Sequence, residues 1–143
     1  IRPDFSDLPE DAEITGATFY ITNADLVNDT YTEDSLYRLR RHFEELEATW
    51  RVYRGTGRWS TPGAGSSDYD YYPTRMGLIT SRYNANTVVS CSIDVDEMNA
   101  LKDDNTGIIM VRTGANVWPR NYWGKIHSDP RFPPKFVVDY VIS

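Results

Sequence analysis

Residues 43–72 read FEELEATWRVYRGTGRWSTPGAGSSDYDYY, and the interpretation of the whole sequence starts from this stretch. Most of it shows neither the period of a helix nor that of a strand. A long irregular segment inside a compact domain is usually functional or packed on itself. The aromatic residues Trp50, Tyr53 and Trp59 predict a small apolar cluster, and the neighbouring glycines permit tight turns. We therefore predict a long ordered loop at residues 43–72.

The segments on both sides of this loop alternate apolar and polar residues, as half-buried strands do. Residues 14–22 place Phe19 and its second neighbours on one face, and residues 35–41 direct Tyr37 and Leu39 inward. Further strands are predicted at residues 76–83, 87–93, 108–112, 121–127 and 135–142.

Turn and capping residues complete the predicted organisation. Residues 84–86, Asn-Ala-Asn, predict a hairpin between two neighbouring strands. Asp96 is the expected N-cap of one short helix at residues 97–102. About eight strands with one short helix predict an all-β fold, an antiparallel β-sandwich with the connectivity of a jelly roll.

Length and composition restrict the classes of function. The 143 residues suit a single domain, and the first residue is not Met, so we expect a fragment of a larger polypeptide. A net charge of -6 disfavours broad attraction to nucleic acid or to anionic membranes. No apolar run approaches the roughly 20 residues of a membrane span. Cys91 has no partner for an intrachain disulfide, and we expect it to be a small buried apolar residue.

Catalytic motifs are absent from the sequence. The two histidines, His42 and His127, lie far apart, and no nucleophile elbow, phosphate loop or dinucleotide-binding motif occurs. We therefore expect no catalytic residues and no enzymatic activity.

Exposed aromatic residues interleaved with polar ones favour sugar binding, because a pyranose ring stacks its apolar face on an aromatic ring and offers hydroxyl groups at its edge. Two stretches have this pattern, one in the long loop and one near the C-terminus. The candidate carbohydrate-binding residues are Trp59, Tyr69, Tyr71, Tyr72, Trp118, Arg120, Asn121, Tyr122 and Trp123. If the polysaccharide is anionic, Arg54, Arg58 and Arg120 are the expected contacts.

Two alternatives accompany this interpretation. The tryptophans could instead close the ends of the sandwich core, which we expect above all of Trp50. The carboxylates Asp68 and Asp70, or Asp25 and Asp29, could hold a structural Ca²⁺, although hydrogen bonding within turns is the usual role of such aspartates. No other cofactor is expected.

The long loop also resembles a known family, the DNRLRE or disaggregatase-related extracellular β-sandwich domains. Matching residues are Phe43, Glu45, Thr49, Trp50, Trp59, Thr61, Pro62, Gly63, Asp68 and Asp70. Asp94, Val95, Asn105, Gly107 and the closing strand at residues 135–142 are similar too, so the resemblance spans nearly the whole chain. Phe43 departs from the pattern, since Trp is usual there.

The resemblance implies a non-catalytic carbohydrate-binding module, located outside the cell or on a cell or virion surface, that recognises a polysaccharide such as alginate. Members of the family usually have further strands upstream, so we expect a fold that is either short at its N-terminus or completed by another segment or another subunit. A second hypothesis is therefore a structural or adhesive subunit of a virion, filament or cell envelope, in which the sandwich contacts neighbouring copies across an open sheet edge.

Overall fold

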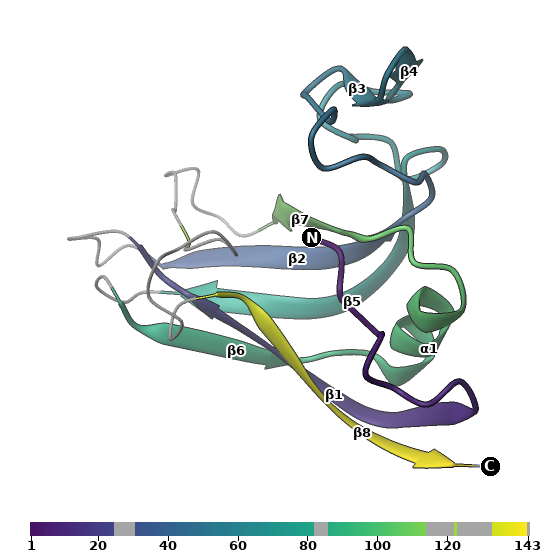
Figure 1. The fold of residues 1–143 in the computed structure, drawn as a ribbon. Coiled ribbons are helices and arrows are strands. Elements are labelled where there is room, and N and C mark those ends of the chain that lie inside the picture. The colour runs from purple at the N-terminus through teal and green to yellow at the C-terminus, as the bar shows by residue number, and fades with distance from the viewer. Residues whose placement is uncertain (25–30, 82–85, 114–121, 123–132, 143) are drawn as a thin grey trace.

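The computed structural model describes residues 1–24, 31–81, 86–113, 122 and 133–142. In these ranges the chain forms eight strands and one helix (Figure 1). The elements are β1 (Ala12–Thr22), β2 (Thr32–Leu39), β3 (Val52–Arg54), β4 (Gly57–Arg58), β5 (Tyr71–Ser81), β6 (Val88–Ser92), α1 (Val95–Asp103), β7 (Ile108–Arg112) and β8 (Lys135–Ile142). All described strand pairs are antiparallel, so the predicted all-β class is confirmed.

Two three-stranded sheets enclose one hydrophobic core. The strand orders are β6-β1-β8 and β5-β2-β7, and the short β3-β4 pair stands apart from them in the long loop (Figure 1). Strands of both sheets and α1 contribute to a single buried cluster. The architecture is therefore sandwich-like, and among the described strands β5 and β7 lie at the edges of one sheet and β6 and β8 at the edges of the other.

The alternation in β1 places its apolar face in this core, as predicted. Phe19 is fully buried, and Ala17 and Ile21 are buried beside it. Phe19 lies directly opposite Phe136 of β8, and the two rings stack with their centroids 4.7 Å apart. The pair joins the centre of the sheet to its edge strand.

The prediction for β2 is partly wrong. Leu39 is buried as predicted and ends the strand, but Tyr37 is only half-buried, and the fully buried apolar residue is Leu36. The pairing of β2 with β5 shifts register between Leu36 and Tyr37. Such an irregularity interrupts the two-residue alternation from which the inward face was inferred.

The predicted hairpin at residues 84–86 is also wrong, because the strands around it belong to different sheets. β5 pairs with β2, whereas β6 pairs with β1. The two strands still lie close together, since a Cβ added to Gly77 of β5 would come 2.9 Å from Cys91 Sγ of β6. The chain therefore changes sheets here, and apolar alternation alone does not distinguish this crossing from a hairpin.

The helix exists but begins earlier than predicted. Its N-cap is Asp94, whose carboxylate accepts a hydrogen bond of 3.0 Å from the Glu97 N–H group, and Asp96 lies in the first turn. Met98 is buried in the core. The Asn99 side chain fixes the helix to β1 because it accepts from the Ile14 N–H group at 3.0 Å and donates to the Ile14 carbonyl at 2.9 Å. The described ranges contain no helix with the length and apolar character needed to cross a membrane.

Cys91 is half-buried on β6, against the core, rather than fully buried. Burial raises the pKa of its thiol to about 11, although a backbone hydrogen bond at Leu78 opposes the shift. Since the thiolate is the reactive form, Cys91 is expected to react with an aromatic disulfide reagent at pH 8 about two orders of magnitude more slowly than free cysteine. The control is Ser92→Cys in a Cys91→Ser background, because residue 92 is exposed on the same strand. Equal rates for the two thiols would contradict the prediction.

Candidate functional site

The long loop is an ordered structure of its own that projects from the two sheets (Figure 1). Its strands β3 and β4 form a short hairpin, in which Gly55 adopts a φ of +43° at the turn. The Glu44 N–H group donates to the Tyr53 carbonyl at 2.9 Å, and the Trp59 N–H group donates to the Arg51 carbonyl at 3.1 Å. The expectation that this segment is packed on itself is therefore confirmed.

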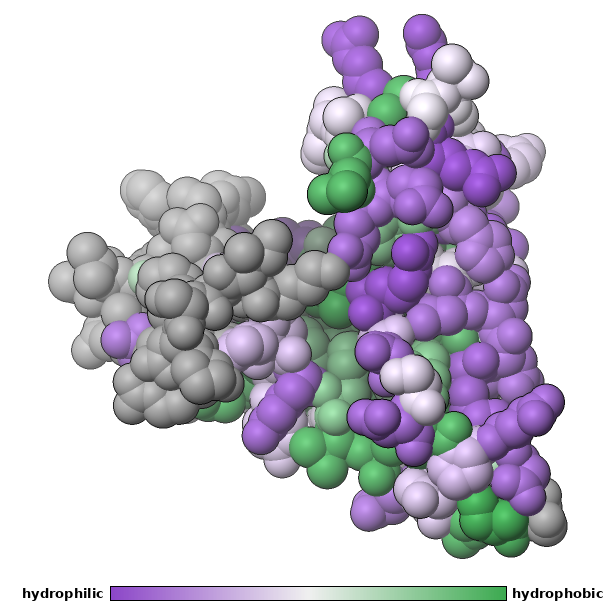
Figure 2. Space-filling model, in the orientation of Figure 1, coloured by the Kyte–Doolittle hydropathy of each residue, from purple (hydrophilic) through white to green (hydrophobic). Residues whose placement is uncertain are grey.

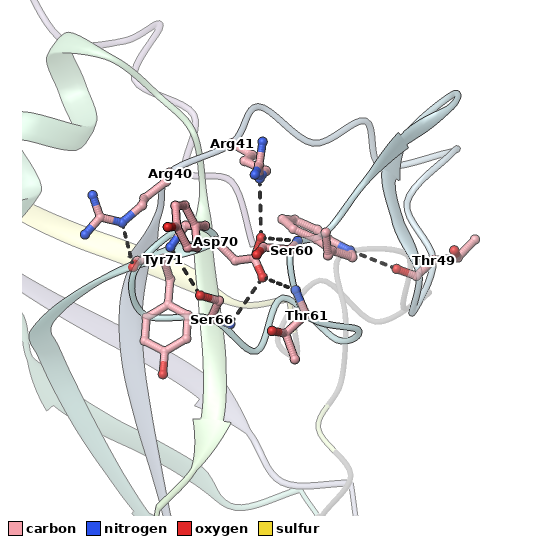
Figure 3. Close-up of polar contacts among 10 residues, drawn as sticks. Arg40, Arg41, Thr49, Ser60, Thr61, Ser66, Asp70 and Tyr71 are labelled. Atoms are coloured by element: carbon pink, nitrogen blue, oxygen red, sulfur yellow. Dashed lines mark hydrogen bonds and ion pairs between the residues drawn. The ribbon is translucent and has the colours of Figure 1, made fainter.

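Asp70 organises the second half of the loop (Figure 3). Its side chain is fully buried. The carboxylate accepts backbone N–H groups from Ser60 at 2.7 Å, Thr61 at 2.9 Å and Ser66 at 3.2 Å. The Arg41 guanidinium, 3.3 Å away, supplies a charged partner. Asp70 therefore holds two segments of the loop, at Ser60–Thr61 and at Ser66, around one carboxylate.

The electrostatics of Asp70 follow from these contacts. Burial favours the neutral carboxyl and by itself would raise the pKa. The N–H groups of Thr61, Ser60 and Ser66, and then Arg41, favour the charged form, and their combined effect lowers the pKa of Asp70 below its usual value. Asp70 is thus a buried carboxylate at neutral pH.

The two carboxylates of the predicted calcium pair have different surroundings. Asp68 is exposed, whereas both oxygens of Asp70 accept N–H groups, which a metal ion on Asp70 would have to displace. In the described part of the chain, no three His, Cys, Asp or Glu side chains gather as a metal site would require. Calcium at Asp68 and Asp70 stays a prediction; Asp25 and Asp29 lie outside the described residues.

The predicted tyrosines differ in how much of each ring is available. Tyr69 is 63% exposed. The Tyr72 ring lies between two guanidinium groups, with Arg38 Cζ 3.8 Å and Arg40 Cζ 4.2 Å from its centroid. The Tyr71 ring packs against Tyr37, with centroids 4.9 Å apart. Of the three rings, Tyr69 is thus the one that offers a face to solvent.

Arg40 secures the base of the loop (Figure 3). Its Nε atom donates to the Tyr71 carbonyl at 2.9 Å, and Nη2 donates to the Ser67 carbonyl at 3.2 Å. Its own N–H group donates to the Asp70 carbonyl at 2.8 Å. The arginine therefore has a structural role, in addition to its contact with Tyr72.

The tryptophans of the loop form a surface that the sequence pattern did not reveal. Trp59 is half-buried, packs against Tyr53 in a tilted arrangement with centroids 5.5 Å apart, and donates from Nε1 to the Thr49 carbonyl at 3.0 Å. Trp50 is 72% exposed and its six-membered ring lies against Gly63, whose φ is +75°. The expectation that Trp50 closes the sandwich core is therefore wrong, because the loop carries the residue away from the sheets.

Trp50 and Trp59 line one open groove between the long loop and the edge of β7, which we call the aromatic groove. Its volume is about 260 Å³. The lining residues are Ile1, Leu39, Phe43, Thr49, Trp50, Trp59, Gly63, Ala64, Ile108 and Ile109. The groove therefore combines two indole rings with an apolar floor and is open to solvent. Gly63 makes room for the Trp50 ring, because a side chain at this position would collide with it.

A larger cavity of about 680 Å³ lies between the N-terminal segment and β8. Phe5, Phe43, Phe136 and Val138 supply apolar walls, and three carboxylates lie at its boundary with Arg2 and Lys135. Among the described residues that line this cavity there is no indole.

The second predicted aromatic stretch lies mostly outside the described residues. This applies to Trp118, Arg120, Asn121 and Trp123. Tyr122 is described, and its hydroxyl donates to Asp34 Oδ2 at 2.9 Å. Asp34 is buried and also accepts from Arg112 Nε at 2.5 Å. Tyr122 is thus attached to an ion pair at the β2-β7 boundary, and the structure does not bring it to the loop residues.

Comparison of the chain with protein-family models, curated proteins and solved structures gave no match.

Proposed function

We propose that the chain is a non-catalytic carbohydrate-binding domain that recognises a polysaccharide in the aromatic groove. The observation that carries the proposal is the exposure of Trp50, at 72%, beside a second indole at Trp59. An exposed indole loses hydration at its apolar face when a ligand covers it, and sugar C–H groups complement that face.

The arginines of the long loop support an anionic polysaccharide as the ligand. They are Arg51, Arg54 and Arg58, and they lie in the sequence between Glu44, Glu45 and Glu47 on one side and Asp68 and Asp70 on the other. All three are exposed, although the chain as a whole carries a net charge of -6. Guanidinium groups form paired hydrogen bonds with carboxylates, so a uronic acid polymer such as alginate suits these arginines.

This proposal agrees with the resemblance to DNRLRE-type domains. The same resemblance supports a proposal for the architecture and the location of this chain. We propose that the two sheets are the central part of a jelly roll and that the domain works outside the cell, as part of a larger polypeptide. In this proposal the binding residues are Trp50, Trp59 and Tyr69, with Tyr71 and Tyr72 supporting the loop.

A specific observation favours assembly as a second candidate function. Among the described strands β8 lies at the edge of its sheet, and its residues Val137, Tyr140, Val141 and Ile142 are 44–53% exposed. Figure 2 shows hydrophobic residues gathered at the lower right, where β8 ends. Such an edge suits contact with a neighbouring copy in a filament or envelope.

Replacement of Trp50 by Ala is the direct test of sugar binding. We expect at least a tenfold loss of affinity for alginate, about 1.4 kcal/mol, because the variant lacks the exposed stacking face. The melting temperature is expected to change little, since the ring is 72% exposed. Affinity electrophoresis in alginate gels measures the first quantity and differential scanning calorimetry the second.

Leu46→Ala is the matched control, because Leu46 is fully exposed in the same loop and offers no aromatic ring. It is expected to bind like the parent protein. Replacing Arg54 and Arg58 by Gln should weaken retention on alginate and reduce its dependence on salt. If the parent protein is retained on neither alginate nor neutral polysaccharides and forms larger assemblies as its concentration rises, assembly is the better account.

A further inference from the structure

Two arginines at the base of the long loop share one aromatic ring. Arg38 Cζ lies 3.8 Å and Arg40 Cζ lies 4.2 Å from the centroid of the Tyr72 ring. The two guanidinium carbons are therefore no farther apart than the sum of these distances, which is about one Debye length at physiological ionic strength. Salt screens their repulsion only in part at this range, so the pair favours a negative charge beside it.

The described residues supply little negative charge to this pair. Arg38 Nε is 2.9 Å from Glu97 Oε2, and within the described part of the chain this is the one ion pair that either arginine forms. Arg40 donates from Nε and Nη2 to the carbonyl groups of Tyr71 and Ser67, which carry no net charge. Two guanidinium groups thus share a single carboxylate.

Several donors of the pair have no acceptor among the residues that the structure describes. In these ranges Nη1 and Nη2 of Arg38 and Nη1 of Arg40 form no hydrogen bond. The Arg38 side chain is only 16% exposed, yet none of these three atoms is fully buried, so each reaches solvent. A guanidinium stacks through its face and donates in its plane, so contact with Tyr72 leaves these N–H groups able to bind a ligand.

We propose that Arg38 and Arg40 form a binding site for an oxyanion, which is a carboxylate, sulfate or phosphate group, beside Tyr72. Arg38 offers such a group paired hydrogen bonds from Nη1 and Nη2. Arg40 adds a second positive charge and the Nη1 donor. The bound anion offsets the repulsion between the two cations and satisfies N–H groups that the protein leaves to water.

This site is separate from the aromatic groove. The described lining of the groove includes none of the three residues. In Figure 3 Arg40 lies on the opposite side of Asp70 from Thr49, whose carbonyl accepts the Trp59 indole. The inference therefore does not depend on sugar binding in the groove, and either can fail without the other.

Titration of the full chain with sodium sulfate, followed by NMR of the arginine Nε–H groups, tests the site. We expect saturable shifts of the Arg38 and Arg40 signals when chloride keeps the ionic strength constant. Arg38→Gln is expected to weaken sulfate binding at least fivefold, because it removes the paired donors and one of the two charges. Arg51→Gln is the matched control, since it removes the same charge at an exposed position of the loop, and it should bind within twofold of the parent protein.

Glu97→Gln tests the site in the opposite direction. It removes the carboxylate that competes for Arg38, so sulfate binding is expected to strengthen at least threefold. A purely structural role of the arginines would not produce this gain. If Arg38→Gln is too unstable to purify, Arg38→Lys replaces it, because lysine keeps the charge but lacks the paired donors, and it should bind at least threefold more weakly than the parent protein.

Parallel titrations with sodium phosphate and with short guluronate oligomers identify the source of the oxyanion. Saturable shifts of the same signals by the oligomers assign the site to a polysaccharide carboxylate, and shifts by sulfate or phosphate alone assign it to a free anion. Shifts that are no larger than those caused by chloride, for all three probes, would overturn the proposal. So would a Glu97→Gln variant that binds no better than the parent protein.

Discussion

Asp70→Ala is expected to lower the free energy of unfolding by about 3 kcal/mol at pH 7, because it leaves three partly buried N–H groups without this acceptor and Arg41 without its carboxylate partner. The carboxylate is fully buried, and its contacts with Ser60, Thr61 and Ser66 hold the turns of the long loop. Urea denaturation followed by tryptophan fluorescence measures this loss. Trp50 and Trp59 make the fluorescence sensitive to the loop itself.

The loss of stability caused by Asp70→Ala is expected to become smaller at low pH. The pKa of Asp70 is lowered in the folded protein, so its ionised form is favoured by folding. The stabilisation is present above about pH 4, where an unfolded aspartate is ionised, and is lost as the pH falls through the folded-state pKa. The difference between parent and Asp70→Ala should therefore shrink below about pH 4.

Asp68→Ala is the matched control, since Asp68 is exposed two residues away in the same turn. It is expected to change the free energy of unfolding by less than about 0.5 kcal/mol. Similar losses for the two variants at pH 7 would show that the hydrogen bonds to Asp70 do not stabilise the loop. A calcium site at both residues would show itself instead as stabilisation by added Ca²⁺ that both variants abolish.

Phe19→Ala is expected to have the largest effect on the whole domain, a loss of about 4 kcal/mol in the free energy of unfolding. Phe19 is fully buried at the centre of the β6-β1-β8 sheet, and the substitution removes both its packing and its stacking on Phe136. The resulting cavity lies between two sheets whose backbones are held by their ladders, so it collapses little. Equilibrium denaturation by urea, monitored by far-ultraviolet circular dichroism, measures the loss.

Val137→Ala provides the comparison on the opposite face of the same sheet, because Val137 is 49% exposed. A change below about 1 kcal/mol is expected for this variant. If Phe19→Ala itself is too unstable to purify, Phe19→Leu should show a smaller loss of the same sign. A stability of Phe19→Ala equal to that of Val137→Ala would contradict the assignment of the core.

Patterns of neighbouring residues in the sequence predicted those parts of the fold that depend on residues close together in the chain. The two-residue alternation identified the buried face of β1, with Phe19 at its centre, and the density of glycines and aromatics identified an ordered loop. The same alternation failed to assign β5 and β6 to sheets, because a strand has the same pattern whichever partner it bonds to. Asp94 and Asp96 are equally good capping residues by type, and only the backbone of the folded helix distinguishes them.

The candidate site depends on tertiary structure, which patterns of neighbouring residues in the sequence do not reveal. A buried carboxylate such as Asp70 is stable only where several N–H groups turn toward it, and Ser60, Thr61 and Ser66 do so only in the folded loop. The exposure of Trp50 follows from the projection of the loop, a tertiary property, whereas large aromatic residues are buried on average. The aromatic groove accordingly contains one predicted binding residue, Trp59, and one that was assigned to the core.

The long loop connects two strands that are direct neighbours, since Leu39 of β2 pairs with Tyr71 of β5. Its two ends are therefore already joined by the sheet, with the Arg40 N–H group 2.8 Å from the Asp70 carbonyl oxygen. Because the entropy of closing a loop grows slowly with its length, the sheets tolerate inserts of very different size at this junction. The body of the domain can therefore carry loops of different length between β2 and β5 while the pairing of these two strands stays the same.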